Sequence, residues 1–153
     1  MVSKGNKSGS VEKLTQEKRI ESVMIVDDSE PSVFLTRKYL EMSGKFGEIY
    51  NAANGEEALD SLQKLRSADP PRKPSVILLD INMPRMNGFE FLEEYEKLIE
   101  KTELDEVSYI LMFTTSDYSE DIKRAKQFKS VSKYIVKPLT SENVDEIIDE
   151  FGT

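Results

Sequence analysis

Four apolar segments of this chain each end on a polar residue with reactive chemistry, and this pattern restricts the fold more than any other feature of the sequence. The four segments end at Asp27-Asp28, Asp80, Thr114 and Lys137. Short apolar runs of this kind, separated by helical stretches, predict a parallel α/β sheet. Functional groups in such sheets collect at the carboxyl ends of the strands, so we expect these polar residues to form one site.

Strand and helix signals alternate along the chain from Ser22 onward. Strands are predicted at 22–27, 49–53, 76–80, 108–114 and 134–136, and helices at about 31–44, 54–65, 88–101, 119–129 and 140–151. Asn54 and either Thr140 or Ser141 are the predicted N-caps of two helices, and the proline-rich stretch 68–74 is a predicted loop. The fold class that follows is α/β, a doubly wound parallel sheet of five strands.

The first 20 residues differ from the rest of the chain in being polar throughout most of their length. We expect residues 1–20 to be a flexible leader, with a short helix permitted around Val11, Leu14 and Lys18. Residues 21–153 are expected to form one domain of ordinary core size. Five βα units fill that domain, so no attached output domain is expected.

Composition excludes several classes of function. The formal net charge of −8 argues against nucleic-acid binding, which depends on clustered basic side chains. No apolar stretch is long enough to span a membrane and the chain has no cysteine, so a cytoplasmic location is expected. The chain has no histidine, which excludes serine–histidine catalysis. If the chemistry of the chain involves a phosphohistidine, that histidine must belong to a partner.

The acids at two of the strand ends are a strong functional signal. Asp27 and Asp28 are adjacent, and Asp80 closes a strand predicted to neighbour theirs. Three carboxylates so close together repel one another unless a cation neutralises them, and hard oxygen ligands favour Mg²⁺ or Mn²⁺. An isolated Asp-Asp pair would be better explained as solvated turn residues. The third acid favours a metal site.

Thr114 and Lys137 supply complementary groups at the other two strand ends. A hydroxyl and a fixed cation facing a carboxylate can stabilise the oxygens of a transferring phosphoryl group. Taken alone, Lys137-Pro138 is better explained structurally, since prolines end strands and lysines protect strand edges. Its combination with the three acids favours Mg²⁺-assisted phosphoryl transfer to an aspartate.

The same segments, in their order and spacing, resemble the receiver domain of response regulators over about residues 22–151. The motifs that carry the resemblance are Val26-Asp27-Asp28, Asn54-Gly-Glu-Glu-Ala-Leu59, Asp80-Ile-Asn-Met-Pro-Arg-Met-Asn-Gly88, Met112-Phe-Thr114 and Tyr134-Ile-Val-Lys-Pro138. The resemblance implies a flavodoxin-like (βα)5 fold with strand order 2-1-3-4-5, of the single-domain, CheY-like type.

The resemblance also implies roles for the acids and the lysine. Asp80 would accept the phosphoryl group. Asp28 would bind Mg²⁺ directly, and Asp27 would act largely through metal-bound water. The backbone carbonyl of Asn82 would be a further metal ligand, and Lys137 would pair first with Asp80 and then with the phosphate.

The switch that the resemblance implies consists of Thr114 and Tyr134. Thr114 would move to the phosphoryl oxygen and leave space for Tyr134 to turn inward, and the Lys137-Pro138 peptide would be cis. Two positions depart from the family's pattern. Thr115 is larger than usual, so the family's water access and rate of phosphate loss do not carry over, and Asn87 replaces an aspartate in a turn.

The function that follows is that of a stand-alone response regulator in a two-component system or phosphorelay. A sensor histidine kinase or a histidine phosphotransfer protein would donate the phosphoryl group, and a downstream protein would read the result. The chain would not be an enzyme beyond slow self-phosphorylation and self-dephosphorylation. Three alternatives stay open: a receiver fragment of a larger regulator or hybrid kinase, a phosphate-independent interaction module, and an Mg²⁺-dependent aspartyl phosphohydrolase. The hydrolase is disfavoured because Asn82 stands where such enzymes carry a second aspartate.

The charge pattern suggests a homodimer in addition. The predicted fourth helix is basic and the final helix acidic, through Lys123, Arg124, Lys126 and Lys129 on the one and Glu142, Asp145, Glu146, Asp149 and Glu150 on the other. Two copies would pair through the face formed by these helices and the fifth strand. Two ordinary solvated helix faces explain the pattern slightly better.

Overall fold

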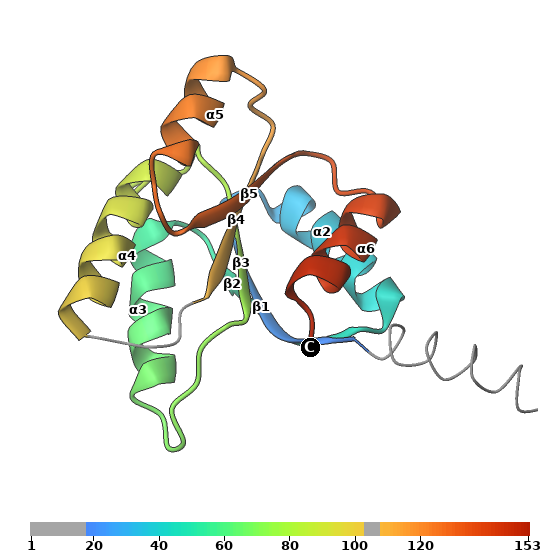
Figure 1. The fold of residues 1–153 in the computed structure, drawn as a ribbon, viewed down its shortest axis with the longest axis horizontal. Helices are drawn as coiled ribbons and strands as arrows, with labels where there is room; N and C mark the ends of the chain where they lie inside the picture. The colour runs from blue at the N-terminus through green and yellow to red at the C-terminus, as the bar shows by residue number, and fades with distance from the viewer. Residues whose placement is uncertain (1–17, 103–107) are drawn as a thin grey trace, which may run out of the picture.

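The computed structural model describes residues 18–102 and 108–153, which form a parallel α/β sheet with helices on both faces (Figure 1). The strands are β1 (Ile20–Val26), β2 (Phe46–Ala52), β3 (Val76–Leu79), β4 (Tyr109–Thr114) and β5 (Val131–Val136). The helices are α2 (Glu30–Ser43), α3 (Gly55–Arg66), α4 (Gly88–Thr102), α5 (Ser119–Lys126) and α6 (Ser141–Phe151). The short helix predicted around Val11 and Leu14 lies outside the described residues.

The strands are all parallel and lie in the order β2-β1-β3-β4-β5, which confirms the predicted topology. Helices α2 and α6 cover one face of the sheet, and α3, α4 and α5 cover the other (Figure 1). The chain adds β2 on one side of β1 and β3 on the other. The carboxyl ends of β1 and β3 therefore form the point at which the winding reverses, where doubly wound sheets bind their ligands.

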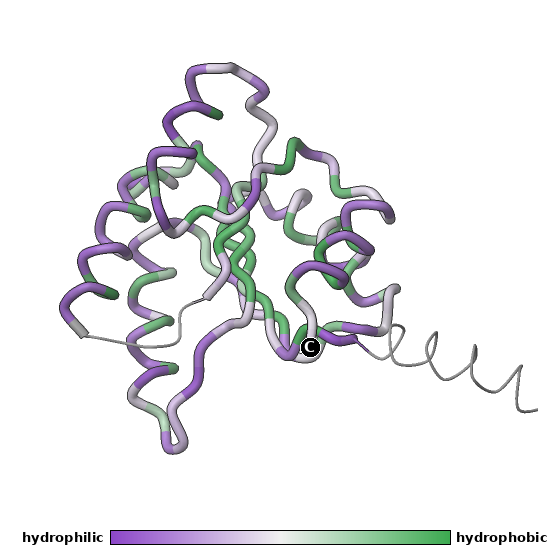
Figure 2. Tube along the Cα trace, in the orientation of Figure 1, coloured by the Kyte–Doolittle hydropathy of each residue, from purple (hydrophilic) through white to green (hydrophobic). Residues whose placement is uncertain are grey.

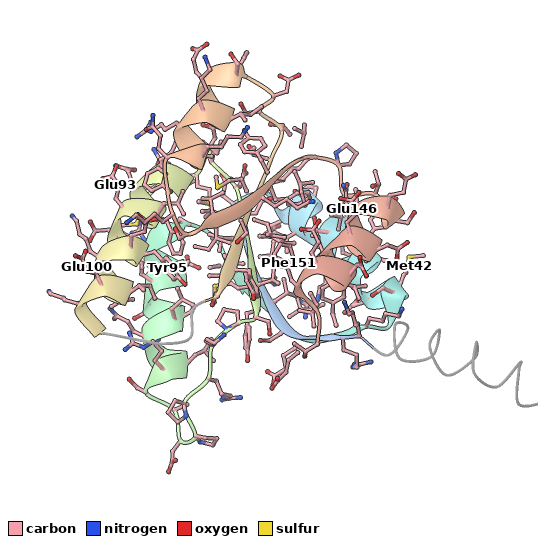
Figure 3. The ribbon with its side chains drawn as sticks, in the orientation of Figure 1. Met42, Glu93, Tyr95, Glu100, Glu146 and Phe151 are labelled. Carbon is pink, nitrogen blue, oxygen red and sulfur yellow. The ribbon has the colours of Figure 1, made fainter. Side chains whose placement is uncertain are left out.

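Two apolar cores, one on each face, hold the sheet in place, and Figure 2 shows the central strands as its most hydrophobic part. The core under α3, α4 and α5 includes Met24, Ile77 and Phe91, and the core under α2 and α6 includes Ile25, Leu78 and Ile147. Successive residues of one strand alternate between the two cores, as the pleat requires. Along α4, Tyr95 lies between the helix and the sheet, whereas Glu93 and Glu100 project outward (Figure 3).

Several helix ends follow the local sequence as predicted. Asn54 caps α3 by accepting a hydrogen bond from the Glu57 amide, and Thr140, rather than Ser141, caps α6 in a capping box with Asn143. Gly44 ends α2 with a left-handed φ of 69°. Within the described ranges, no helix is long and apolar enough to cross a membrane.

Three strands begin earlier than their apolar runs predict. β1 begins at Ile20, β2 at Phe46 and β5 at Val131, because backbone pairing carries the ladders into less apolar residues. In β2, for example, Gly47 and Glu48 separate Phe46 from the apolar part of the strand, but Phe46 still belongs to the strand because it pairs with Ile20. Helix α5 is shorter than predicted and ends at Lys126, after which Phe128 turns back to stack on Phe89.

Candidate functional site

The acids at the ends of β1 and β3 come together as the sequence predicts. Val26 and Leu79 pair across these two central strands, so the residues that follow them, Asp27 and Asp80, emerge side by side. Carboxylate oxygens of Asp27, Asp28 and Asp80 all lie within 4.8 Å of one another. Asp27 and Asp80 are buried and Asp28 is exposed, so the cluster has one side toward solvent.

Asp27 is held on both carboxylate oxygens. The Ser29 amide donates to Oδ1 at 2.9 Å, and the Ser32 hydroxyl donates to Oδ2 at 2.9 Å. Lys137 Nζ also reaches Oδ2, at 2.5 Å. These donors fix the orientation of a side chain that is only 1% exposed. They also neutralise a buried charge that would otherwise be costly.

Asp80 is held less fully. The Ile81 amide donates to its Oδ1 at 2.8 Å, and Lys137 Nζ lies 3.5 Å from its Oδ2. Burial raises the pKa of the Asp80 carboxyl, and the neighbouring Asp27 charge adds to the rise, while Lys137 and the Thr114 hydroxyl offset part of it. Burial favours the neutral acid, so a cation in the cluster would restore the carboxylate.

The loop after β3 is fixed against the end of that strand. The Gly88 amide donates to the Ile81 carbonyl at 2.8 Å, and a Cβ at Gly88 would lie 2.3 Å from the Asp80 carbonyl oxygen. Only glycine fits there. Asn87 caps the start of α4 by accepting from the Glu90 amide, which explains how asparagine serves in place of aspartate. Asn82 lies on this loop and is exposed, and its carbonyl as a metal ligand stays a prediction.

Thr114 is the last residue of β4, Tyr134 lies within the neighbouring strand β5, and Ser116 connects them. Thr114 is fully buried, and its Oγ1 accepts a hydrogen bond from the Ser116 amide at 3.4 Å. The Tyr134 hydroxyl donates to the Ser116 carbonyl at 2.9 Å, and burial raises the pKa of that phenol. Tyr134 is thus already attached to the β4–α5 loop. Thr115, between the two bonded residues, is exposed.

The Lys137-Pro138 peptide is cis, as expected. Sequence reasoning missed four side chains that organise the site: Ser29 and Ser32 around Asp27, and Ser116 and Asp121 beyond Thr114. Short polar residues near helix starts carry no periodic signal. The spacing of Asp27 and Ser29 across a helix N-cap is the only hint that the sequence offers.

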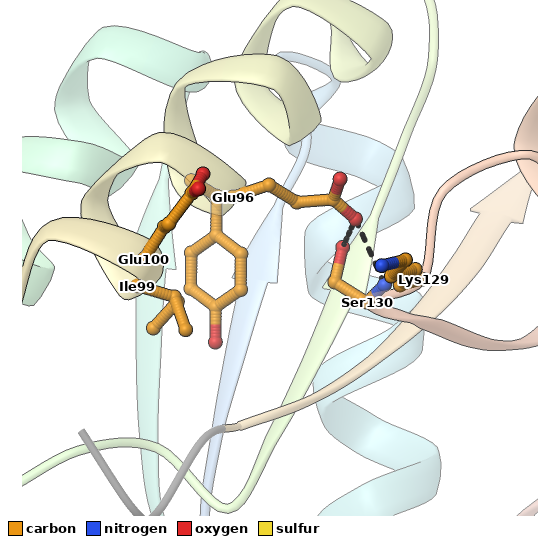
Figure 4. Close-up of a pocket in the computed structure, with 6 residues that line it drawn as sticks. Glu96, Ile99, Glu100, Lys129 and Ser130 are labelled. Atoms are coloured by element: carbon orange, nitrogen blue, oxygen red, sulfur yellow. Dashed lines mark hydrogen bonds between the residues drawn. The ribbon is translucent and has the colours of Figure 1, made fainter. Parts of the chain in front are cut away.

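A hollow of about 510 Å³ lies away from the acids, against α4 and the loop before β5. Its lining includes Tyr95, Glu96 and Ser130, and Glu96 accepts hydrogen bonds from both the amide and the hydroxyl of Ser130 (Figure 4). These bonds attach α4 to the residue that precedes β5, which gives the polar groups Glu96 and Ser130 a structural role. The reactive residues do not line this hollow; they lie at the carboxyl edge of the sheet.

The donor set of the acidic cluster suits a hard divalent cation. Three carboxylates meet there, and a chain without histidine and cysteine offers neither an imidazole nor a thiolate ligand. All-oxygen sites select Mg²⁺, Ca²⁺ or Mn²⁺ over softer metals. The residues present therefore fit Mg²⁺.

A doubly wound sheet with an acid cluster, a threonine and a lysine at its carboxyl edge defines a class of signalling domain. The family model for the response regulator receiver domain matches residues 23–149, and the chain belongs to this family. Receiver domains are phosphoacceptor signalling modules that use Mg²⁺ at such a cluster and interact with histidine kinases and downstream targets.

Several individual relatives of this chain are also response regulators or regulatory proteins by name. The chain is 28% identical over 128 residues to a probable methanogenesis regulatory protein, FilR2, of Methanothrix harundinacea, covering 84% of this chain and 79% of the relative. It is 27% identical to the protein PilH of Pseudomonas aeruginosa, over 83% of this chain and 93% of the relative. A two-component response regulator from Cytophaga hutchinsonii superposes with a TM-score of 0.78 at 28% identity, over 88% of this chain and 98% of the other. Against several other relatives the chain spans half of their length or less.

Proposed function

We propose that this chain is a stand-alone response regulator that accepts a phosphoryl group on Asp80 from a phosphohistidine of a partner protein. The observation that carries the proposal is the placement of Lys137 Nζ between two buried carboxylates, 2.5 Å from Asp27 and 3.5 Å from Asp80. A fixed cation beside a partly held carboxylate is the arrangement that in-line phosphoryl transfer requires. The proposal retains the cytoplasmic location expected from the cysteine-free composition.

In the transfer, an oxygen of Asp80 attacks phosphorus as the phosphorus–nitrogen bond of the donor histidine breaks. The bonding electron pair returns to the imidazole, and Asp80 becomes an acyl phosphate. Lys137 neutralises part of the charge on the phosphoryl oxygens, and Asp27 keeps the lysine in place. Asp27, Asp28, Asp80 and the Asn82 carbonyl would hold Mg²⁺, which offsets charge on the transferring group.

Thr114 and Tyr134 would report the change. Thr114 lies close enough to influence the Asp80 carboxyl, and it shares Ser116 with Tyr134. An acyl phosphate adds charge and acceptor oxygens beside Thr114. Any movement of the threonine toward them disturbs its 3.4 Å bond with the Ser116 amide, and Tyr134 responds through the same residue.

The phosphodonor would dock on the exposed apolar surface of α2, where Phe34 and Leu35 are 64% and 48% exposed. Leu35 also lines a groove of about 230 Å³ that leads to Lys137 and Pro138. Apolar exposure next to the reactive lysine suits a sensor histidine kinase or a histidine phosphotransfer protein. A helix of that partner would lie along α2 and present its phosphohistidine to Asp80.

The homodimer through α5, β5 and α6 has less support. Lys133 of β5 binds Glu146 and Glu150 of α6 within the same chain, at 3.2 and 2.8 Å. Arg124 stacks on Phe89, 4.3 Å from the ring centroid. These contacts occupy some of the charged side chains that a second copy would need for pairing. We therefore propose that a downstream protein, and not a second copy, binds this face.

The hydrolase alternative would need an acid two residues after Asp80, and that residue is Asn82. An amide does not transfer protons as a general acid or base. An interaction module that never takes phosphate would have no use for Lys137 between two buried acids. The receiver role explains both observations.

The test is the intact mass of the protein after incubation with a small-molecule phosphodonor and Mg²⁺. One added phosphoryl group is expected on the wild type, and none on Asp80→Asn or after chelation of the metal. Asp60→Asn, an exposed acid of α3, is the matched control and should be labelled like the wild type. Labelling of Asp80→Asn would contradict the proposal.

A further inference from the structure

Ser116 is the residue at which both switch residues and the start of α5 meet. Its amide donates to Thr114 and its carbonyl accepts from Tyr134, as described above. Its hydroxyl donates to Asp121 Oδ2 at 2.5 Å and lies 3.4 Å from the Tyr118 amide, from which it accepts. Ser116 is 8% exposed, so these bonds form largely out of contact with solvent.

Asp121 is the residue of α5 that is hydrogen-bonded to Ser116. The N-cap residue of α5, Tyr118, makes no side-chain capping bond, so the helix start depends on other contacts. Asp121 lies in the first turn and accepts from Ser116 in a short bond to an ionisable group. The rest of α5 is weakly anchored, since Ala125 is its only buried residue.

We propose that Asp121 is a positioning residue that couples α5 to the state of Thr114 and Tyr134. The inference rests on the proposed function, because it requires that Asp80 be phosphorylated. When Thr114 moves toward the phosphoryl oxygen, the Ser116 amide loses its acceptor and the residue shifts. Asp121 is bonded to the hydroxyl of that same residue, so the first turn of α5 follows the shift.

A purely structural role for Asp121 predicts something different. A bond that only stabilises the helix start would act equally in both states of the site. Its removal would then loosen α5 by the same factor with and without the phosphoryl group. A coupling bond changes the difference between the two states, and that difference is what the experiment measures.

The experiment is hydrogen exchange of the α5 amides, residues 119–126, with and without Mg²⁺ and beryllofluoride, a phosphoryl mimic. Fluorine NMR of the same samples reports whether the mimic occupies the site. In the wild type, exchange in α5 is expected to change when the mimic binds. In Asp121→Ala, which removes the acceptor of the Ser116 hydroxyl, this change should shrink by at least about threefold, the effect of losing one hydrogen bond, while occupancy of the site persists.

Glu120→Ala is the matched control, because it removes a carboxylate from the same helical turn at an exposed position. It should respond like the wild type. Ser116→Ala, which removes the donor of the same bond, should behave like Asp121→Ala, and Ser116→Thr, which keeps the hydroxyl, should keep the response. These outcomes would support the coupling.

The inference is overturned if Asp121→Ala keeps the full wild-type change, or if α5 in the wild type does not respond to an occupied site. A wild type that fails to bind the mimic in fluorine NMR would instead remove the proposed function, and the coupling with it. The two failures are therefore separated by the occupancy measurement.

Discussion

The two halves of the functional edge are held very differently. The acceptor half consists of the ends of β1 and β3 with Asp27, Asp28 and Asp80, and the readout half consists of the ends of β4 and β5 with α5. In the acceptor half, Asp27 is bonded on both oxygens and the loop after Asp80 is fixed by Gly88. In the readout half, Ser116 makes short bonds to Asp121 and Tyr134, at 2.5 and 2.9 Å, but its bonds with Thr114 and with the Tyr118 amide are both 3.4 Å long.

The difference matches the two tasks. Phosphoryl transfer requires reacting groups to be held within a few tenths of an ångström, so loosening the acceptor half would lower the rate. Switching requires an element with two arrangements of similar free energy, which weakly held loops and short helices supply. The fold combines them because both halves meet at one edge of the sheet, with Lys137 between them.

The largest expected effect is that of Asp80→Asn. It should abolish phosphoryl acceptance and, without metal, raise the free energy of unfolding at neutral pH, because burial raises the pKa of this carboxyl. A folded-state pKa above the unfolded one means that the ionised acid destabilises the fold. The gain from the substitution should thus be full above the folded-state pKa and vanish below the unfolded one. Denaturant melts across that range check it, and a less stable Asp80→Asn at neutral pH would contradict it.

The strand ends can be compared directly through the residues that precede the reactive ones. Leu79 precedes the Asp80 position and is fully buried, whereas Val136 precedes Lys137 and is 42% exposed. Leu79→Ala should lower the free energy of unfolding by about 2–5 kcal/mol through cavity formation. Val136→Ala should cost less than about 1 kcal/mol. If chemical denaturation gave equal losses in the free energy of unfolding for Leu79→Ala and Val136→Ala, the contrast between the two halves would be contradicted.

Ser32→Ala tests how firmly the acceptor half is held. It removes the hydroxyl that donates to Asp27 Oδ2 at 2.9 Å and leaves a buried carboxylate with fewer donors. We expect a loss of about 1–3 kcal/mol in the free energy of unfolding. Ser141→Ala, at an exposed position at the start of α6, is the matched control and should change stability little. An unchanged midpoint for Ser32→Ala would mean that Asp27 does not depend on this bond.

Tyr134→Phe should have the smallest effect. It removes the hydroxyl that donates to the Ser116 carbonyl, at a cost of about 0.5–1.5 kcal/mol in the free energy of unfolding. Phosphoryl acceptance, measured by intact mass, should be retained because the acceptor half is untouched. Tyr118→Phe makes the same change at a residue that is 70% exposed and should be neutral. Loss of acceptance in Tyr134→Phe would show that the halves are not separable.

Most of the fold follows from the sequence because buried parallel strands are apolar throughout. The runs before Asp27, Asp80 and Thr114 identify three central strands and bring their terminal residues to one edge. Edge strands are harder, since β2 and β5 are stabilised on one side by backbone pairing that side chains do not reveal. The first residues of both, from Phe46 and from Val131, do not follow from the apolar runs, and neither does the early start of the central strand β1 at Ile20, which pairs with Phe46 of the edge strand β2.

The site was predictable to the same extent. Strand-end position identifies Asp27, Asp80 and Lys137, which the structure brings within ion-pair distance. The residues that hold them do not follow from any period or motif. Ser32 and Asp121 reach their partners five residues away across a loop and a helix start, and only the folded backbone defines such contacts.

The most direct test of the account is to locate the acyl phosphate. After phosphorylation with a small-molecule donor and Mg²⁺, borohydride reduces an aspartyl phosphate to homoserine, and peptide mass spectrometry then identifies the converted residue. The account predicts conversion at Asp80 alone, in the peptide that contains the end of β3. Conversion at Asp27 or Asp28 with Asp80 unchanged would contradict it.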